Sequence, residues 1–166
     1  MFLMSQSINL QLLLLTTLIS IGLPTTSWTA CADYELPINQ AVQAYDLDSL
    51  EKLLVTLNKQ SDCPIAYLEN VKRSMAQIVA AKADSLTQQN QLDDAEMWLK
   101  RAPVILWVTQ VIRGDIAARR QQWYTASQFY QQALNLINSP ETTPPPEAVV
   151  EKIHHLASDT YRKAQQ

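Results

Sequence analysis

Glycine is almost absent from this chain, and its scarcity constrains the fold more than any other feature of the sequence. Gly22 and Gly114 are the only two glycines among 166 residues. Tight turns between antiparallel strands need backbone conformations that glycine adopts most readily. After residue 31, the sequence is instead rich in alanine, glutamine, leucine, glutamate and lysine, which favour helix. No alternating strand pattern of useful length appears, so the sequence predicts an all-α fold.

The first thirty residues have the pattern of a signal peptide. No side-chain charge occurs before Asp33, and residues 12–23 read LLLLTTLISIGL. A membrane-spanning helix needs about 20 mostly apolar residues, whereas a signal-peptide core needs about 7 to 15. We therefore expect residues 1–30 to be a signal peptide, cleaved between about 27 and 32. The chain would then be exported to the periplasm or secreted; an uncleaved membrane anchor is the alternative.

The position of cleavage decides the fate of Cys31. The best small-x-small pattern is Ala-Cys-Ala at residues 30–32, and cleavage after it would remove this cysteine, whereas cleavage after residue 27 would keep it. Residues 28–31, WTAC, also resemble a bacterial lipoprotein signal, which would attach a lipid to Cys31. If Cys31 remains unmodified, it and Cys63 are the only two thiols of an exported chain. A disulfide between them is then expected, with a lone buried Cys63 as the alternative.

The remaining chain, about 136 residues long, has the size of one domain. Its net charge is −3. Basic residues are scattered along it, whereas binding to nucleic acid needs a concentrated basic face. We therefore expect no nucleic-acid partner, and membrane contact only through the signal peptide or a lipid on Cys31.

Prolines and acidic residues predict where the helices begin. Pro37, Pro64 and Pro103 each suit the first turn of a helix, where a missing N–H costs nothing. Two segments, Asp48-x-x-Glu51 and Asp93-x-x-Glu96, resemble capping boxes at the starts of two further helices. These signals predict helical hairpins over about 36–60, 64–102 and 104–138, with one long uninterrupted helix between residues 65 and 89.

A final amphipathic helix is expected over residues 147–165, after the proline-rich segment 139–146. Its apolar stripe would consist of Val150, Ile153, Leu156 and Tyr161.

Small and bulky residues recur at fixed spacings along the predicted hairpins. In this pattern, a small residue is followed by further small or bulky residues twelve, sixteen and nineteen positions later. The clearest copy is Gly114, Ala126, Tyr130 and Ala133. The other copies are Ala83, Ala95, Leu99 and Ala102, and, in degenerate form, Ile38, Leu50, Leu54 and Leu57. Small residues at such spacings let paired helices approach closely.

This pattern resembles the tetratricopeptide repeat, most closely over residues 114–140, GDIAARRQQWYTASQFYQQALNLINSP. The resemblance implies a short right-handed stack of antiparallel helix hairpins, an α-solenoid closed by a C-terminal capping helix. The period departs from the family's roughly 34 residues, because the second-helix positions Leu50, Ala95 and Ala126 are 45 and then 31 residues apart. An insertion of about three turns in the long helix would explain the larger interval. An ordinary helical bundle is the alternative.

The resemblance further implies a partner protein bound in the concave groove formed by the first helices of the hairpins. The positions that usually face this groove are Asn39, Gln43, Asp84, Gln88, Asp115 and Arg119. Some family members bind a C-terminal carboxylate there, but Asp84 and Asp115 would repel one. Trp107 and Trp123 are candidate aromatic anchors for a partner, whereas Trp98 and Tyr130 are expected in the core.

Residues suited to catalysis are few. The sequence lacks a phosphate-binding glycine loop and a serine nucleophile motif. His154 and His155 point about 100° apart on a helix, and Glu151 alone does not complete a metal site. We therefore expect no enzyme, metal or cofactor, but a protein-binding adaptor of the bacterial periplasm or cell envelope. The alternatives are a small metal-dependent enzyme using the histidine pair, and a carrier of a small apolar ligand in a pocket lined by Trp98, Trp107 and Trp123.

Overall fold

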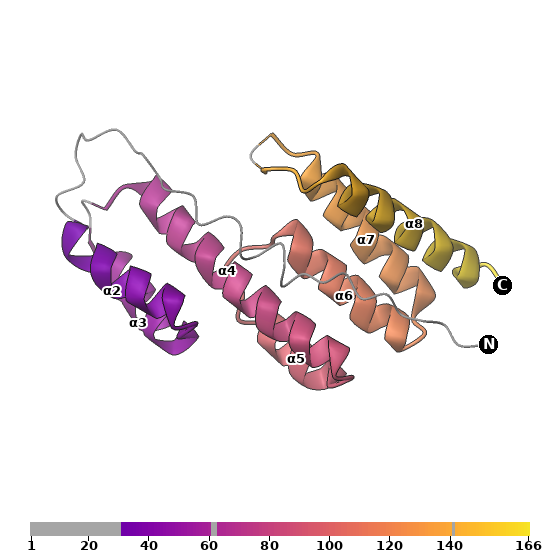
Figure 1. Ribbon diagram of the computed structural model, residues 1–166, viewed down its shortest axis with the longest axis horizontal. Coiled ribbons are helices and arrows are strands. Elements are labelled where there is room, and N and C mark those ends of the chain that lie inside the picture. Colours follow the sequence, from indigo (N-terminus) through magenta and orange to yellow (C-terminus); the bar gives the residue numbers. More distant parts are fainter. Residues whose placement is uncertain (1–30, 61–62, 141) are drawn as a thin grey trace. The chain divides into compact units, whose positions relative to one another are not determined.

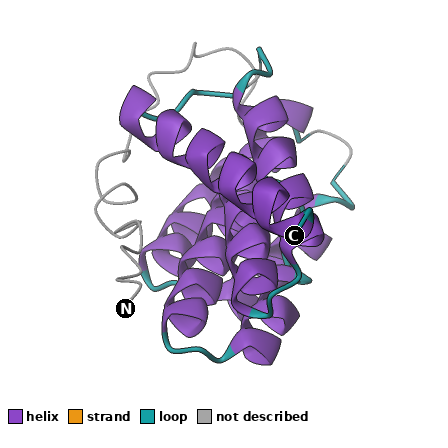
Figure 2. Cartoon of the chain, turned by 90° about the vertical axis from the view of Figure 1, so that its right-hand side faces the viewer, coloured by secondary structure: helices purple, strands orange, loops and turns teal. Residues whose placement is uncertain are grey.

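The structure is a computed structural model that describes residues 31–60, 63–140 and 142–166. All regular secondary structure in these ranges is helical, as Figure 2 shows. The helices, labelled in Figure 1, are α2 (Ala32–Gln43), α3 (Leu47–Leu57), α4 (Ile65–Gln88), α5 (Leu92–Leu99), α6 (Trp107–Arg119), α7 (Trp123–Ile137) and α8 (Glu147–Ala164). The predicted all-α class is therefore confirmed for the described residues.

The signal-peptide prediction concerns residues 1–30, which lie outside the described residues. Within the described ranges, no helix combines the length and the apolar character needed to cross a membrane.

The chain divides into two compact units, Met1–Leu68 and Glu69–Gln166, which are described separately. In the first unit, α2 packs against α3, and a disulfide joins Cys31 to Cys63 with their Cα atoms 5.6 Å apart. The predicted cysteine pairing is thus confirmed. Leu50 and Leu57 of α3 are completely buried in this hairpin region.

In the second unit, α6, α7 and α8 lie side by side as antiparallel neighbours, and α5 also packs against α6 (Figure 1). These three helices share a core that consists of Val111 and Ala117 from α6, Ala126, Tyr130, Ala133, Leu134 and Ile137 from α7, and Ile153 from α8. The α4 helix is continuous over 24 residues, which confirms the predicted long helix.

Three turns with the same backbone geometry connect α2 to α3, α4 to α5 and α6 to α7. Each turn has a non-glycine residue in the left-handed region, with φ of 54° at Tyr45, 61° at Asn90 and 59° at Gln121. The N–H of the next residue donates to a carbonyl five residues earlier, at 2.9 Å in all three turns. This is the Schellman arrangement that ends a helix and reverses the chain. The chain thus makes repeated tight helix–helix turns without glycine.

The predicted repeat positions on the second helix of each pair lie at a constant distance in sequence from these turns. Leu50, Ala95 and Ala126 each lie five residues after the left-handed residue, and each has no exposed surface. On the preceding helices, Ile38, Ala83 and Gly114 are also buried. Of the copied positions, Ala102 departs from the pattern, since it is partly exposed in the loop after α5.

Both predicted capping boxes are wrong. Helix α3 begins two residues earlier than expected, and its N-cap is Asp46, whose carboxylate accepts the Ser49 N–H at 3.0 Å. Helix α5 has Gln91 at its N-cap position, so Asp93 lies inside the first turn and cannot cap it. The common turn geometry, rather than the Asp-x-x-Glu spacing, sets where these helices begin.

Two of the three proline predictions are also wrong. Pro37 lies in the interior of α2, because the helix already begins at Ala32. Helix α6 begins at Trp107 rather than near Pro103, and the Leu106 N–H donates to Thr109 Oγ1 at 3.1 Å. Pro64 fits its prediction, since it directly precedes α4 and its carbonyl accepts the first backbone bonds of that helix.

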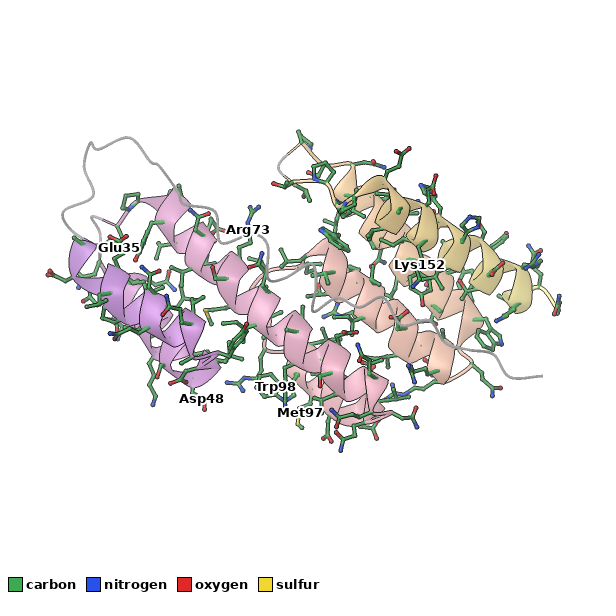
Figure 3. All side chains as sticks on the ribbon, in the orientation of Figure 1. Glu35, Asp48, Arg73, Met97, Trp98 and Lys152 are labelled. Carbon is green, nitrogen blue, oxygen red and sulfur yellow. A yellow bond between two sulfur atoms is a disulfide. The ribbon has the colours of Figure 1, made fainter. Side chains whose placement is uncertain are left out.

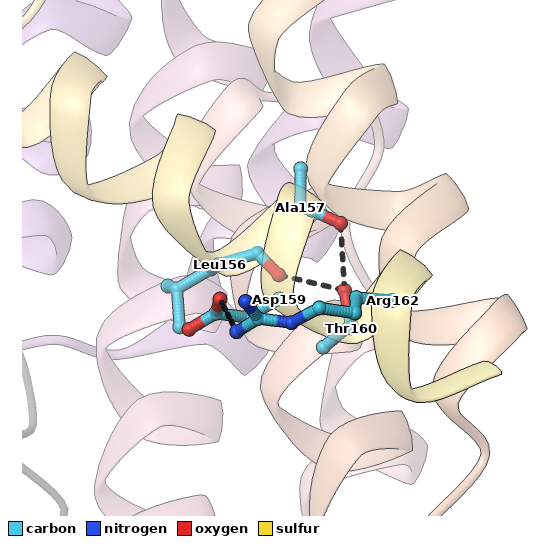
Figure 4. A network of polar contacts seen from close by, with 5 residues as sticks. All are labelled: Leu156, Ala157, Asp159, Thr160 and Arg162. Atoms are coloured by element: carbon cyan, nitrogen blue, oxygen red, sulfur yellow. Dashed lines mark hydrogen bonds and ion pairs between the residues drawn. The ribbon is translucent and has the colours of Figure 1, made fainter. Parts of the chain in front are cut away.

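The predicted stripe of α8 is correct except at its C-terminal end. Ile153 is completely buried, but Tyr161 is 52% exposed and Thr160 is buried in its place. The Thr160 hydroxyl donates to the Leu156 and Ala157 carbonyls at 2.7 and 3.1 Å, as Figure 4 shows. A threonine satisfied by its own helix can be buried at low cost, so the polar residue occupies the inward position.

Candidate partner-binding site

Charged and polar side chains from α4, α6, α7 and α8 approach one another in the second unit. We call this group the paired-aspartate site; it consists of Asp84, Gln88, Asp115, Arg119, Tyr130 and Lys152. Gln88 Nε2 donates to Asp84 Oδ2 at 2.7 Å within α4. The Tyr130 hydroxyl of α7 donates to Asp115 Oδ1 of α6 at 2.6 Å. Both carboxylates are half-buried, and each is held by one neutral donor.

Gly114 explains how Tyr130 reaches Asp115. A Cβ atom at residue 114 would lie only 2.5 Å from Cε1 of the Tyr130 ring. The absent side chain therefore lets the ring lie directly on the α6 backbone, with the phenol beside the next residue. Tyr130 itself is 1% exposed, so its hydroxyl needs a partner and finds it in Asp115.

Burial destabilises the ionised forms of both aspartates, and a like charge adds to this effect at Asp84. Burial, together with the negative charge of Asp115, raises the pKa of Asp84 to about 6. Burial also raises the pKa of Asp115, although the Tyr130 hydroxyl acts in the opposite direction. The same surroundings, burial first and the Asp115 charge second, raise the pKa of the Tyr130 phenol. At neutral pH, the site therefore holds two carboxylates in a place that disfavours their charge.

Two cations balance part of this negative charge. Arg119 is exposed on α6, and its charge lowers the pKa of both aspartates. Lys152 lies on α8, where Figure 3 labels it, and its charge lowers the pKa of Asp115. The site thus combines opposite charges from three helices, which is suited to binding a charged group of another molecule.

Four of the six predicted groove residues belong to this site: Asp84, Gln88, Asp115 and Arg119. The remaining two, Asn39 and Gln43, are exposed on α2 in the first unit. Tyr130 and Lys152 were not predicted as site residues. Gly114 and Tyr130 belong to the same copy of the repeat pattern, but their spacing does not show that the Tyr130 hydroxyl reaches Asp115.

The four tryptophan and tyrosine residues singled out above differ in their surroundings. Tyr130 is a core residue, as predicted. Trp107 is partly buried against the same core. Trp123 is also partly buried, with Lys163 Nζ 4.6 Å from its ring centroid. Trp98 is half-buried rather than fully in the core, and the Arg101 guanidinium lies 4.9 Å from its ring centroid.

The residues of the two alternative functions are exposed or partly buried. Glu151, His154 and His155 are all exposed on α8, and no cluster of three or more metal-binding side chains occurs in the described part of the chain. A cavity does lie between α5, α6 and α7, but Trp98, Trp107 and Trp123 do not line it.

The acidic residues of the rejected second capping box have another role. Arg120, just after α6, pairs with both Asp93 and Glu96 of α5, the latter through Nη1 and Oε2 at 3.0 Å. This bridge fastens the short helix α5 to the end of α6. Because it is exposed to solvent at Asp93, its contribution to stability is modest.

Comparison with known proteins gives no match: none among protein-family models, curated proteins or solved structures.

Proposed function

We propose that this chain is an exported, non-catalytic protein-binding module built from tetratricopeptide-like hairpins. In this proposal, the paired-aspartate site lies in the groove that receives the partner. Constant turn geometry and buried residues at the repeat positions support the hairpin part of the proposal. The surroundings of Asp84 and Asp115 support the binding part.

The single observation that carries the binding role is the cost of keeping Asp84 and Asp115 together. Burial and the Asp115 charge raise the pKa of Asp84 to about 6, so its ionised form at neutral pH lowers the stability of the free protein. Unfavourable charge arrangements in a folded protein are concentrated at sites that bind or react. A positively charged group of a partner would relieve the repulsion between these carboxylates. A segment carrying lysine or arginine therefore fits the site, and a C-terminal carboxylate does not.

The disulfide supports the proposed export. Cys31–Cys63 is a structural bridge across the first unit, and such bridges persist in oxidising compartments. A mature chain that keeps this bridge must be cleaved before Cys31. The disulfide also leaves no free Cys31 thiol to carry a lipid. We therefore propose that the protein is in the periplasm or outside the cell, without a lipid anchor.

Recovery of the partner from the envelope fraction, with wild type and an Asp84→Asn/Asp115→Asn variant as bait, tests the binding role. Substitution by asparagine removes both charges and keeps the size of each side chain. The matched control is Asp94→Asn/Glu147→Gln, which removes two exposed charges from α5 and α8. All three proteins should have the same helical content by circular dichroism.

We expect the same protein to be captured by wild type and by the control, and at least tenfold less of it by the paired-aspartate variant. Raising the salt concentration should also reduce capture by wild type, since exposed charges are screened. Equal recovery by all three baits would remove the paired-aspartate site from the proposed function.

A further inference from the structure

A cavity of about 390 Å³ lies in the second unit between α5, α6 and α7. Residues Arg113, Ile116 and Ala117 form its α6 wall. Successive helix residues turn by about 100°, so these three lie on a different side of α6 from Asp115 and Arg119. The cavity is therefore separate from the paired-aspartate site, and its role does not depend on the function proposed above.

One part of the cavity lining is apolar. Leu99 of α5 and Ile116 of α6 line it and are 2% and 1% exposed, so their side chains are fixed in the core. Phe129 of α7 also lines the cavity and is half-buried. An aliphatic and aromatic floor of this kind favours the apolar part of a ligand.

Positive charge at the cavity is not balanced from within the protein. Lys100 and Arg113 both line it, and neither forms an ion pair among the described residues. The polar contact of Arg113 is a 3.4 Å hydrogen bond to Gln110 Oε1. Glu96 is the acidic residue of the lining, but Arg120 already holds its carboxylate at 3.0 Å. Two cations therefore remain available to an anion.

We propose that this cavity binds a small free carboxylic acid with an apolar body, whose carboxylate pairs with Lys100 and Arg113. Arginine suits the carboxylate because its planar guanidinium can donate two parallel hydrogen bonds. A volume of about 390 Å³ lies within the range of small-molecule sites. Thr125 and Gln122 line the same cavity and supply further hydrogen-bonding groups.

Titration calorimetry with 4-phenylbutyrate, which has about twelve non-hydrogen atoms, tests this proposal on the disulfide-bonded protein. The neutral comparison is 4-phenylbutyramide, which has the same shape without the charge. We expect the acid to bind at least tenfold more tightly than the amide. Arg113→Gln and Lys100→Gln should each weaken binding of the acid by about tenfold, and the double variant should bind acid and amide equally.

Two further variants separate the cavity from general effects of charge and folding. Lys59→Gln removes an exposed cation from the first unit and should leave the affinity for 4-phenylbutyrate unchanged. Thr125→Trp fills the cavity from α7 and should abolish binding while circular dichroism still shows the wild-type helical content.

Three results would overturn the proposal. The first is equal affinity for acid and amide. The second is loss of binding in Lys59→Gln to the same extent as in Arg113→Gln, and the third is no heat of binding at millimolar acid. A fourth concerns the source of the carboxylate. If acetyl-Ala-Leu-Phe with a free C-terminus bound much more tightly than 4-phenylbutyrate, the cavity would be assigned to a protein C-terminus instead of a free acid.

Discussion

The ring of Tyr130 lies directly against the backbone of Gly114, so closely that a Cβ atom at residue 114 would be 2.5 Å from ring atom Cε1. This contact joins α6 to α7 and carries the Tyr130 hydroxyl to Asp115, 2.6 Å away. Packing and the paired-aspartate site therefore depend on the same pair of residues.

Gly114→Ala should destabilise the protein, although alanine is the better helix former by about 1 kcal/mol. The new methyl group would collide with a ring that is 1% exposed. We expect a loss of about 1 to 3 kcal/mol in the free energy of unfolding, measured with urea. Adding Tyr130→Leu, which removes the ring, should recover part of the loss caused by Gly114→Ala. An increase in stability for Gly114→Ala alone would show that the contact is not close.

Tyr130→Phe should destabilise the protein at neutral pH and less so in acid. The variant keeps the ring but removes the hydroxyl that donates to Asp115 Oδ1. Loss of a donor to a half-buried carboxylate should cost about 1 to 3 kcal/mol. Protonation of Asp115 would reduce that cost, because the neutral acid needs the donor less. Urea unfolding at pH 7 and pH 4 checks this, and a loss that is larger at pH 4 would contradict it.

Asp84→Asn should increase stability at pH 7. The pKa of Asp84 is raised in the folded protein to about 6 from an ordinary value of 3.8, so the folded state binds the proton more tightly than the unfolded state. The stabilisation of the folded state by this tighter proton binding at Asp84 is fully present below pH 3.8 and is lost as pH rises through about 6. The advantage of Asp84→Asn should therefore grow between pH 4 and pH 6.5 in a series of urea titrations. A constant difference across that range would show that Asp84 titrates normally.

Gln121→Gly should stabilise the turn between α6 and α7. Gln121 has φ of 59°, a conformation that costs a residue with a side chain about 1 kcal/mol and costs glycine almost nothing. We expect thermal unfolding to shift upward by a few degrees for this variant. Gln128→Gly, in the exposed interior of α7, is the matched control and should destabilise by about 1 kcal/mol. If both variants raised the unfolding temperature, or both lowered it, the result would be inconsistent with the turn geometry.

Reduction of the disulfide should loosen the first unit selectively. Cys31 and Cys63 are 32 residues apart, and closing a loop of that length stabilises by about 3 to 4 kcal/mol on the chain-entropy model. Hydrogen exchange of α2 and α3 should accelerate after reduction or in a Cys31→Ser/Cys63→Ser variant, while α6 and α7 keep their protection. Uniform acceleration along the whole chain would mean that the bridge does not act locally.

The repeat pattern could be predicted from sequence because it depends on which side of a helix faces inward. Leu50, Ala95 and Ala126 were found by spacing alone, and all three are completely buried. The same holds for the long α4 helix, since neither glycine nor proline interrupts it. Burial of one helix face is a local property, and periodicity reports it directly.

Helix starts and tertiary pairs could not be predicted in the same way. The Asp-x-x-Glu pattern predicts a cap at Asp93, but Asp93 pairs instead with Arg120, 27 residues away in sequence. Similarly, Tyr130 was expected in the core on local grounds, and only the fold shows that its hydroxyl reaches Asp115. Such contacts depend on how helices pack, which spacing within one helix does not specify.

Site-specific photo-crosslinking tests the central claim, that a partner protein is held at the paired-aspartate site. A photoreactive residue is placed at Gln88, which is exposed at the end of α4, or at Gln128, exposed on α7. On irradiation in cells, we predict one protein adduct from residue 88 and none from residue 128. The adduct at 88 should disappear when Asp84→Asn/Asp115→Asn is added. The same adduct from both positions, or an adduct at 88 that survives loss of both aspartates, would contradict the account.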